Sequence, residues 1–182
     1  MTEATADPSR AAVPGQPARL GRLYLVDDGL QAFRPLSWTR PLCELLFGAE
    51  TFRERFERLL GGRVQGVFTR GRFEGLPFSR LGASPLRVNP SDGAGEPFTV
   101  VDSLYVPAPA GDPLLQARTA PARFWCGGTL VGAELAPAAR SAVLEALHAR
   151  QDWRDAARAG EDVELPGHRP QALHRLVAAN AA

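Results

Sequence analysis

The sequence predicts an α/β domain of three layers, in which helices cover both faces of a mostly parallel sheet. Three observations support this fold class. The apolar run RLYLV at 22–26 is typical of a short, fully buried strand. From Phe52 onward, apolar residues recur at i, i+4, i+7 and i+8, which places them on one face of a helix. A second short apolar run follows at 63–69, and such a strand–helix–strand unit normally forms a right-handed parallel crossover.

The boundaries of the first half follow from local signals. Residues 1–20 are rich in Ala, Pro, Ser and charge, so we expect a disordered tail before a single domain over 21–182. Pro41 is suited to the first turn of a helix, and we therefore expect the first helix to begin near this residue. Gly61-Gly62 is expected to end that helix.

The second half of the chain contains fewer but clear signals. A stretch dense in Gly, Pro and Ser is expected to form mostly loop, with one short helical turn, before a strand at 97–107. Gly127-Gly128 lies between two apolar runs and predicts a two-residue hairpin turn. Pro137 is expected to open a second helix, and Pro170 a last amphipathic stretch.

Composition describes an ordinary globular domain without a strong global charge. The 182 residues are 45% hydrophobic and 23% charged, and their formal net charge is +1. This balance gives no general attraction to nucleic acid or to an anionic membrane. No apolar run approaches the roughly 18 residues of a membrane helix, and the N-terminus lacks the apolar core of a signal peptide. We therefore expect a cytoplasmic protein without nucleic-acid or membrane partners.

The basic residues, 21 in all, are arginines, because the chain contains no lysine. Any bound anion must therefore be held by arginine or by backbone N–H groups. Cys43 and Cys126 belong to no CxxC motif, and we expect both to be buried thiols. His and Cys show no spacing typical of a metal site.

The loop after the first strand is the first candidate site, because ligands of α/β folds bind beyond the carboxyl ends of strands. Arg34 and Arg40 can both point at an anion there, and a helix beginning near Pro41 would add partial positive charge. Asp27 and Asp28 could hold a divalent cation or a ribose hydroxyl. Alternatively, the acids stabilise a turn and the Arg-Pro pairs stiffen the loop.

Two further side chains have both a functional and a structural interpretation. Trp38, in the same loop, either stacks on a base or packs over the core. Asp102 ends the apolar run FTVV, which would carry its carboxylate to the same rim of the sheet. A carboxylate there could bind Mg²⁺ together with substrate phosphates, or it could cap a turn.

The segment LVDDGLQAFRPLSWTRPLCELLFGAETFRERFERLLGGRVQGVFT resembles the start of a family of sugar nucleotidyltransferase domains. That family has a strand, an acidic pair, a pattern close to L-x-P-L-[ST]-[FW]-T-R-P-x-x-E-L-x-x-G, and a helix carrying T-[IF]-R-E. The matching residues are Pro35, Leu36, Ser37, Trp38, Thr39, Arg40, Pro41, Glu44, Leu45, Gly48, Thr51, Phe52, Arg53 and Glu54. Weaker matches lie in VVDSLYVPAP, in GGTLVGAEL, and at Pro170, Leu176 and Asn180.

The resemblance implies a Rossmann-like nucleotidyltransferase sandwich. Such enzymes join a sugar 1-phosphate to a nucleoside triphosphate and release pyrophosphate with the assistance of Mg²⁺, chiefly by positioning and charge neutralisation. The residues it implicates are Arg40 and Arg34 as catalytic phosphate contacts, Asp27, Asp28, Thr39, Trp38 and Glu44 in substrate binding, and Asp102 as the Mg²⁺ ligand.

Two departures from the wider superfamily leave an alternative open. The usual glycine-rich phosphate loop is replaced by DDGLQAFRPLSWTRP, and no lysine is present to contact phosphate. The alternative is a degenerate domain of the same fold that binds a nucleotide or sugar nucleotide without turnover, in a structural or regulatory role. A third reading is an interaction module, because the family domain commonly precedes a left-handed β-helix. Homo-oligomerisation and association with such a β-helix are both compatible with the sequence.

Overall fold

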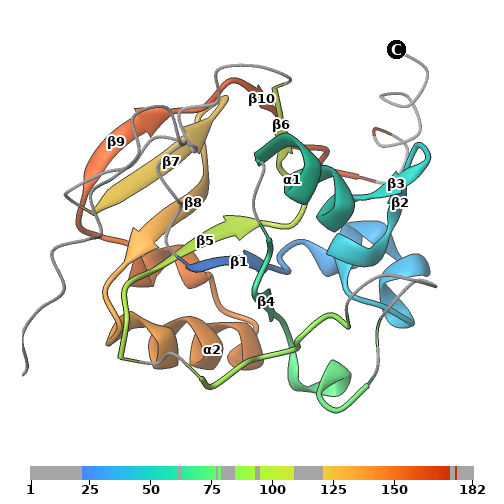
Figure 1. Cartoon of the computed structure of the whole chain (residues 1–182), viewed down its shortest axis with the longest axis horizontal. Helices are drawn as coiled ribbons and strands as arrows, with labels where there is room; N and C mark the ends of the chain where they lie inside the picture. Colours follow the sequence, from blue (N-terminus) through green and yellow to red (C-terminus); the bar gives the residue numbers. More distant parts are fainter. Residues whose placement is uncertain are drawn as a thin grey trace, which may run out of the picture.

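A mixed sheet forms the centre of the molecule. The structure is a computed structural model that describes residues 22–60, 63–76, 78, 85–92, 95–108, 121–172 and 175. Within these residues the largest sheet has six strands in the order β4-β1-β5-β8-β7-β9 (Figure 1). Their bounds are Arg22–Val26 for β1, Gly66–Phe68 for β4, Phe98–Asp102 for β5, Ala122–Cys126 for β7, Thr129–Leu135 for β8 and Glu161–Glu164 for β9.

The strands of this sheet run mostly in one direction. β1 is parallel to both β4 and β5, and β7 is parallel to β9. β8 is antiparallel to both β5 and β7, so it opposes the other five described strands of the sheet. The predicted crossover between the first two apolar runs is thus confirmed as a parallel β1–β4 pair.

Helices cover both faces of the sheet, as the sequence predicts. Alternate side chains of a strand point to opposite faces, and Leu25 packs in one core cluster with Phe56, whereas Tyr24 packs in another with Val143. Figure 1 shows the two helices on opposite sides of the sheet. The α-helices are α1, Phe52–Leu60, and α2, Ala139–Ala149. The described part of the chain holds no helix with the length and apolar character required to span a membrane.

Short elements connect the layers. Among the described residues, the 3₁₀ helices are η1 (Leu30–Phe33), η2 (Leu36–Trp38), η3 (Leu42–Glu44), η4 (Gly71–Phe73) and η6 (Trp153–Ala156). The two small antiparallel sheets pair β2 (Leu46–Phe47) with β3 (Glu50–Thr51), and β6 (Val106–Pro107) with β10 (Gly167–His168).

The prediction that the first helix begins near Pro41 is wrong. Pro41 has extended backbone angles and precedes only the three-residue η3, after which the chain turns through β2 and β3. The helix begins at Phe52 because Thr51 and Glu54 form a capping box. The amide of Glu54 donates to Thr51 Oγ1 at 3.1 Å, and the amide of Thr51 donates to Glu54 Oε2 at 2.7 Å.

Other boundary predictions agree with the structure. Strands β4 and β5 lie in the two predicted segments, and Gly127 and Gly128 form the predicted hairpin turn with φ of 56° and 75°. Both cysteines are free and buried. The sequence did not predict β9, an edge strand of mostly exposed residues without apolar alternation. The predicted tail at 1–20, the Gly61-Gly62 helix end and most of the stretch after Pro170 lie outside the described residues.

Candidate active site

The carboxyl ends of the parallel strands bring acidic residues to one rim of the sheet. Asp27 and Asp28 directly follow β1, and Asp102 ends β5 opposite Val26 in the strand register. Because β8 is antiparallel to β5, its first residues, beginning with Thr129, lie at this same rim. The predicted meeting of the two strand ends is therefore present, and ligands of such folds bind at this rim.

A pocket of about 530 Å³ opens at this rim. Its lining includes four arginines, three aspartates and an indole ring: Asp28, Arg123, Trp125, Gly128, Thr129, Leu130, Asp152, Arg154, Asp155, Ala157, Arg158 and Arg169. A polar pocket with this many guanidinium groups is suited to an anionic ligand.

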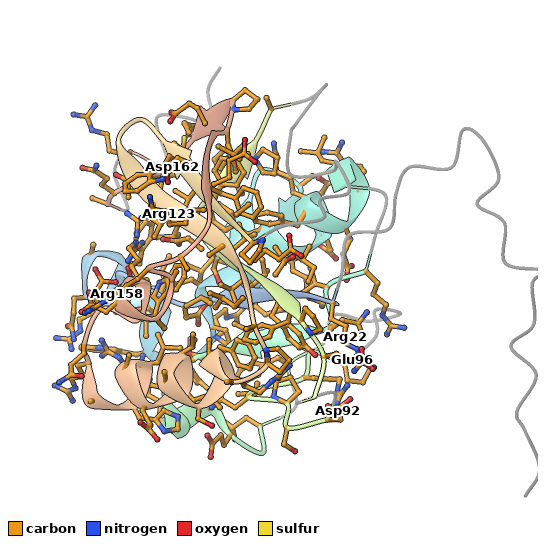
Figure 2. All side chains as sticks on the ribbon, turned by 90° about the vertical axis from the view of Figure 1, so that its left-hand side faces the viewer. Arg22, Asp92, Glu96, Arg123, Arg158 and Asp162 are labelled. Atoms are coloured by element: carbon orange, nitrogen blue, oxygen red, sulfur yellow. The ribbon has the colours of Figure 1, made fainter. Side chains whose placement is uncertain are left out.

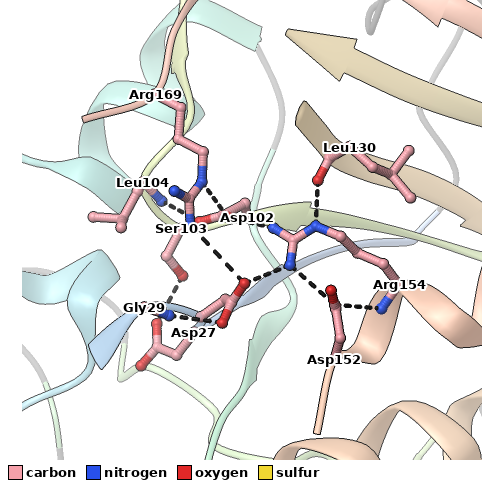
Figure 3. Close-up of polar contacts among 10 residues, drawn as sticks. Asp27, Gly29, Asp102, Ser103, Leu104, Leu130, Asp152, Arg154 and Arg169 are labelled. Carbon is pink, nitrogen blue, oxygen red and sulfur yellow. Dashed lines mark hydrogen bonds and ion pairs between the residues drawn. The ribbon is translucent and has the colours of Figure 1, made fainter. Parts of the chain in front are cut away.

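Arg154, which lines the pocket, is the centre of a polar network at the strand ends (Figure 3). Its Nη1 donates to Asp28 Oδ2 at 2.5 Å and to Asp152 Oδ1 at 3.1 Å. Its Nη2 donates to Asp102 Oδ2 at 3.1 Å, and its Nε to the carbonyl oxygen of Leu130 at 2.6 Å. Burial lowers the pKa of Arg154, but the neighbouring carboxylates, Asp28 first, outweigh burial and raise it. This side chain is therefore a permanent cation.

The 3₁₀ helix η6 directs Arg154 into the site. The Asp152 carboxylate caps η6 by accepting from the amide of Arg154 at 3.0 Å. Trp153 is fully buried in the core cluster beneath α2 and anchors this turn. Because its neighbour is fixed in the core, Arg154 is held with its guanidinium over the strand ends.

Arg169 provides a second guanidinium that is only partly used by the protein. Its Nε donates to Asp102 Oδ2 at 2.7 Å, and its Nη2 lies 3.9 Å from Asp28 Oδ2. The Nη atoms form no hydrogen bond with the residues that the structure describes, although Arg169 lines the pocket. Gly29, with φ of 70°, lets the backbone pass close by, since a Cβ there would lie 3.5 Å from Arg169 Nη2. Arg169 thus retains N–H donors for a ligand.

Asp28 and Asp102 differ in their access to the pocket. The Asp28 side chain is 37% exposed. Burial acts to raise its pKa, but the contact with Arg154 and the nearby Arg169 outweigh burial and lower it. Asp102 is completely buried, and burial raises its pKa even though Arg169 and Arg154 act in the opposite direction. Of these two acids, Asp28 alone offers carboxylate surface to a bound molecule.

The contacts of Asp102 do not fit a Mg²⁺ ligand. Its Oδ2 accepts from Arg154 and Arg169, and its Oδ1 accepts from the amide of Leu104 at 2.9 Å. Among the described residues, no group of three or more His, Cys, Asp or Glu side chains is placed to hold a metal ion. The predicted Mg²⁺ role of Asp102 stays a prediction, and its carboxylate is directed at guanidinium groups instead.

Asp27 turns away from the pocket and joins strands. It is 1% exposed, and its Oδ1 accepts from Ser103 Oγ at 2.7 Å. Its Oδ2 accepts from Thr69 Oγ1 and from the amide of Leu42, each at 3.1 Å. Burial, with a small contribution from Asp102, raises the pKa of Asp27 to about 6. In this conformation Asp27 fixes the loop between β1 and β2, residues 27–45 and here called the opening loop, to the ends of β1, β4 and β5.

The other predicted residues of the opening loop lie outside the pocket lining. Arg34, Trp38, Thr39 and Arg40 are exposed, and the Arg34 guanidinium carbon lies 5.9 Å from the Trp38 ring centroid. Thr39 Oγ1 donates to the carbonyl oxygen of Leu36 at 3.3 Å. Arg40 forms no hydrogen bond or ion pair with any described residue. No described α-helix begins beside Arg40, so the helix-end charge expected there is missing.

Glu44 is part of an internal ion pair. Its Oε1 accepts from Arg53 Nε at 2.5 Å, and the two side chains are only 6% and 4% exposed. This pair joins η3 to α1. The structure therefore places Glu44 in the interior of the domain, apart from the pocket lining.

Sequence reasoning missed the arginines and the tryptophan that line the pocket. Arg123 and Trp125 share one face of β7, which the alternation in ARFWC could have indicated. Asp162 of β9 accepts from Arg123 Nη2 at 2.8 Å and from Trp125 Nε1 at 2.7 Å. In Figure 2, Arg123 lies beside Asp162, whereas Arg158 lies apart from both.

A family model described as sugar nucleotidyl transferase matches residues 23–167. No curated protein matches the chain. The matched segment contains both strand ends and every residue of the pocket except Arg169.

Proposed function

Because the chain belongs to the sugar nucleotidyl transferase family, we propose that it transfers a nucleotidyl group from a nucleoside triphosphate to a sugar 1-phosphate. The observation that carries this proposal is the arginine-lined pocket beyond the carboxyl ends of β1 and β5. The phosphate groups of both substrates are negatively charged. The pocket has guanidinium groups in its lining and lies at the strand ends, where folds of this type bind ligands.

The proposed reaction needs positioning and charge neutralisation more than covalent help from the protein. A phosphate oxygen of the sugar 1-phosphate attacks the α-phosphorus in line. The bond from the α-phosphorus to the oxygen that bridges it to the β-phosphorus breaks, and pyrophosphate leaves with that electron pair. The products are a nucleoside diphosphate sugar and pyrophosphate, and no group is oxidised or reduced.

Arg169 is the best placed residue for contact with the transferring phosphates. It lines the pocket and its Nη groups donate no hydrogen bond to a described residue, while its Nε is fixed by Asp102 at 2.7 Å. Donors whose orientation is set in advance stabilise developing charge without reorganisation in the transition state. Arg158 lines the same pocket with a side chain that is 81% exposed, so it can approach a phosphate from the solvent side.

Asp28 and Trp125 supply contacts for the rest of the substrate. The exposed part of the Asp28 carboxylate can accept from a ribose or sugar hydroxyl. The Trp125 indole is half-buried and held by its hydrogen bond to Asp162, so its ring can pack against a base or a sugar ring.

The second candidate is a domain that binds the same ligands without turnover. The specific observation in its favour is the closed network at the strand ends, in which Asp102 and Arg154 bind each other and neighbouring protein groups. Such a network can position a phosphorylated ligand through Arg169 without providing catalysis.

Pyrophosphate release over a panel of nucleoside triphosphates and sugar 1-phosphates tests the proposed function. We expect release with at least one pair, and a decrease of about a hundredfold in the Arg169→Gln variant, the usual effect of losing one preorganised donor. The matched control is Arg22→Gln, which removes an exposed ion pair with Glu96 at the opposite end of β1 and should leave the rate unchanged (Figure 2). Ligand binding by calorimetry without any release would favour the second candidate, and no binding at all would contradict both.

A further inference from the structure

We infer that Arg154 and Arg169 occupy the position of a divalent cation between Asp28 and Asp102, so that the pocket binds its phosphorylated ligand without a metal ion held by the protein. The identity of the ligand rests on the proposed function. The inference that guanidinium groups take the place of a metal ion rests only on the geometry of the strand ends.

The coordination of Asp102 leaves no room for a metal ion. Oδ2 lies 2.7 Å from Arg169 Nε and 3.1 Å from Arg154 Nη2, and Oδ1 accepts from a backbone amide. Mg²⁺ needs oxygen ligands at about 2.1 Å in octahedral geometry. An ion bound to Oδ2 would also meet two guanidinium groups that already contact the same oxygen, and like charges at such separations repel strongly.

Arg154 connects the two acids as a bridging cation would. Nη1 contacts Asp28 and Nη2 contacts Asp102, at 2.5 and 3.1 Å, so the planar fork spans the ends of β1 and β5. The two arginines carry the same total charge as one divalent cation, opposite the two carboxylates at the strand ends. The third acid on Arg154, Asp152, is 56% exposed and lies on the solvent side of the network.

The remaining donors explain how an anion can still bind. Arg169 lines the pocket and donates to Asp102 through Nε, and its Nη groups, of which Nη2 lies 3.9 Å from Asp28 Oδ2, donate no hydrogen bond to a described residue. A guanidinium group stays protonated throughout the range in which proteins are folded, and its fork matches phosphate oxygens. Positive charge therefore remains available to a phosphate when every free metal ion has been removed by a chelator.

Titration of the wild-type protein with Mn²⁺, without nucleotide, tests the inference directly. We expect no stoichiometric uptake by electron paramagnetic resonance, and no change in the melting temperature. Stoichiometric Mn²⁺ uptake that disappears in Asp102→Asn would overturn the inference. This measurement gives its result whether or not the protein is an enzyme.

Nucleotide affinity in chelator provides the second test. We expect the calorimetric Kd for a nucleoside triphosphate in EDTA to lie within about tenfold of its value in Mg²⁺, that is within about 1.4 kcal/mol. A larger loss of affinity in EDTA would contradict the inference. If no triphosphate binds under either condition, the proposed function fails, and the Mn²⁺ titration alone decides the inference.

A double variant shows whether the arginines stand in a cation position. In Arg154→Gln/Arg169→Gln the two carboxylates are released, and we expect Mn²⁺ to bind at least tenfold more tightly than to the wild type and to raise the melting temperature. The matched control, Arg22→Gln/Arg58→Gln, removes two arginines from exposed ion pairs with Glu96 and Glu50 and should gain no Mn²⁺ affinity. A folded double variant that takes up no Mn²⁺ would contradict the inference. If the double variant does not fold, Arg169→Gln alone replaces it, with a smaller expected gain.

Discussion

Asp27 and Asp28 are adjacent in the chain but have opposite surroundings. Asp27 accepts three hydrogen bonds from neutral donors and lies in the interior, where burial raises its pKa to about 6. Asp28 contacts Arg154, keeps part of its surface in the pocket and has a lowered pKa. The acidic pair that is prominent in the sequence therefore divides into one residue that holds the loop and one that lines the pocket.

The raised pKa of Asp27 predicts a specific pH dependence of stability. Between its ordinary pKa of 3.8 and about 6, the folded protein holds a proton that the unfolded chain has released. Stability should therefore fall as pH rises through this window, and the cost should persist above it. Asp27→Asn removes this ionisation, and its amide can donate to Ser103 Oγ while its oxygen still accepts from Leu42 and Thr69.

The measurement is urea unfolding of the wild type and of Asp27→Asn between pH 4 and pH 7. We expect the two free energies of unfolding to diverge as pH rises, with the variant more stable at pH 7 by about 1–3 kcal/mol. Parallel curves across this range would show that Asp27 ionises in the folded protein as it does in the unfolded chain.

At the scale of elements, the sequence predicted those with a distinct local signal. The strands β1 and β4 lie in continuous apolar runs, α1 has an apolar face with a helical period, and Gly127 and Gly128 are a turn signal. The start of α1 was misplaced because Pro41 is also compatible with a loop, whereas the capping box at Thr51 is specific. The edge strand β9 has no apolar period and is recognisable only from its pairing with β7.

The candidate site could be predicted only in part. The sequence located Asp28 and Asp102 at one rim, because strand ends follow from apolar runs. It could not locate Arg154 or Arg169, since Arg154 is 126 residues from Asp28 and no local pattern links the two. Arginine is also the most common charged residue of this chain, so the sequence does not distinguish an arginine that lines a pocket from one on the solvent-exposed surface.

The buried pair of Glu44 and Arg53 allows a test of how η3 is held on α1. Glu44→Ala removes the carboxylate from a buried guanidinium, and we expect the free energy of unfolding to fall by about 3–5 kcal/mol. The double variant Glu44→Met/Arg53→Met removes both charges and should recover most of this loss. Chemical unfolding of the three proteins measures the effect.

Ligand binding by the same variants separates structure from function at Glu44. If the folded double variant keeps its calorimetric affinity for a nucleoside triphosphate, the pair is structural. A folded double variant without affinity would instead support the substrate-binding role predicted from the sequence.

At the scale of the whole molecule, the three tryptophans report on three different regions. Trp38 is 58% exposed in the opening loop, Trp125 lines the pocket, and Trp153 is fully buried in the core. We expect a nucleotide that binds in the pocket to change the fluorescence of Trp125, because in the proposed complex that ring packs against the ligand. The wild type and Trp38→Phe should therefore respond to ligand, whereas Trp125→Phe should not.

The opposite pattern would locate the ligand elsewhere. A response that is lost in Trp38→Phe and kept in Trp125→Phe would place the nucleotide on the opening loop, beside Arg34 and Arg40. This experiment therefore distinguishes the site predicted from the loop sequence from the pocket that the folded chain forms.

The contacts of Arg154 and Arg169 also have a consequence for the order in which the protein is made. Asp28 precedes Arg154 by 126 residues in the chain. Asp102 precedes Arg154 by 52 residues and Arg169 by 67 residues. At about 5–20 residues per second, a ribosome makes Asp28 and Asp102 roughly 3 to 25 seconds before their partners. During that interval β1, β4 and β5 can associate with two uncompensated carboxylates at one rim. Segments that are translated later thus complete the charge balance of a site that earlier segments began.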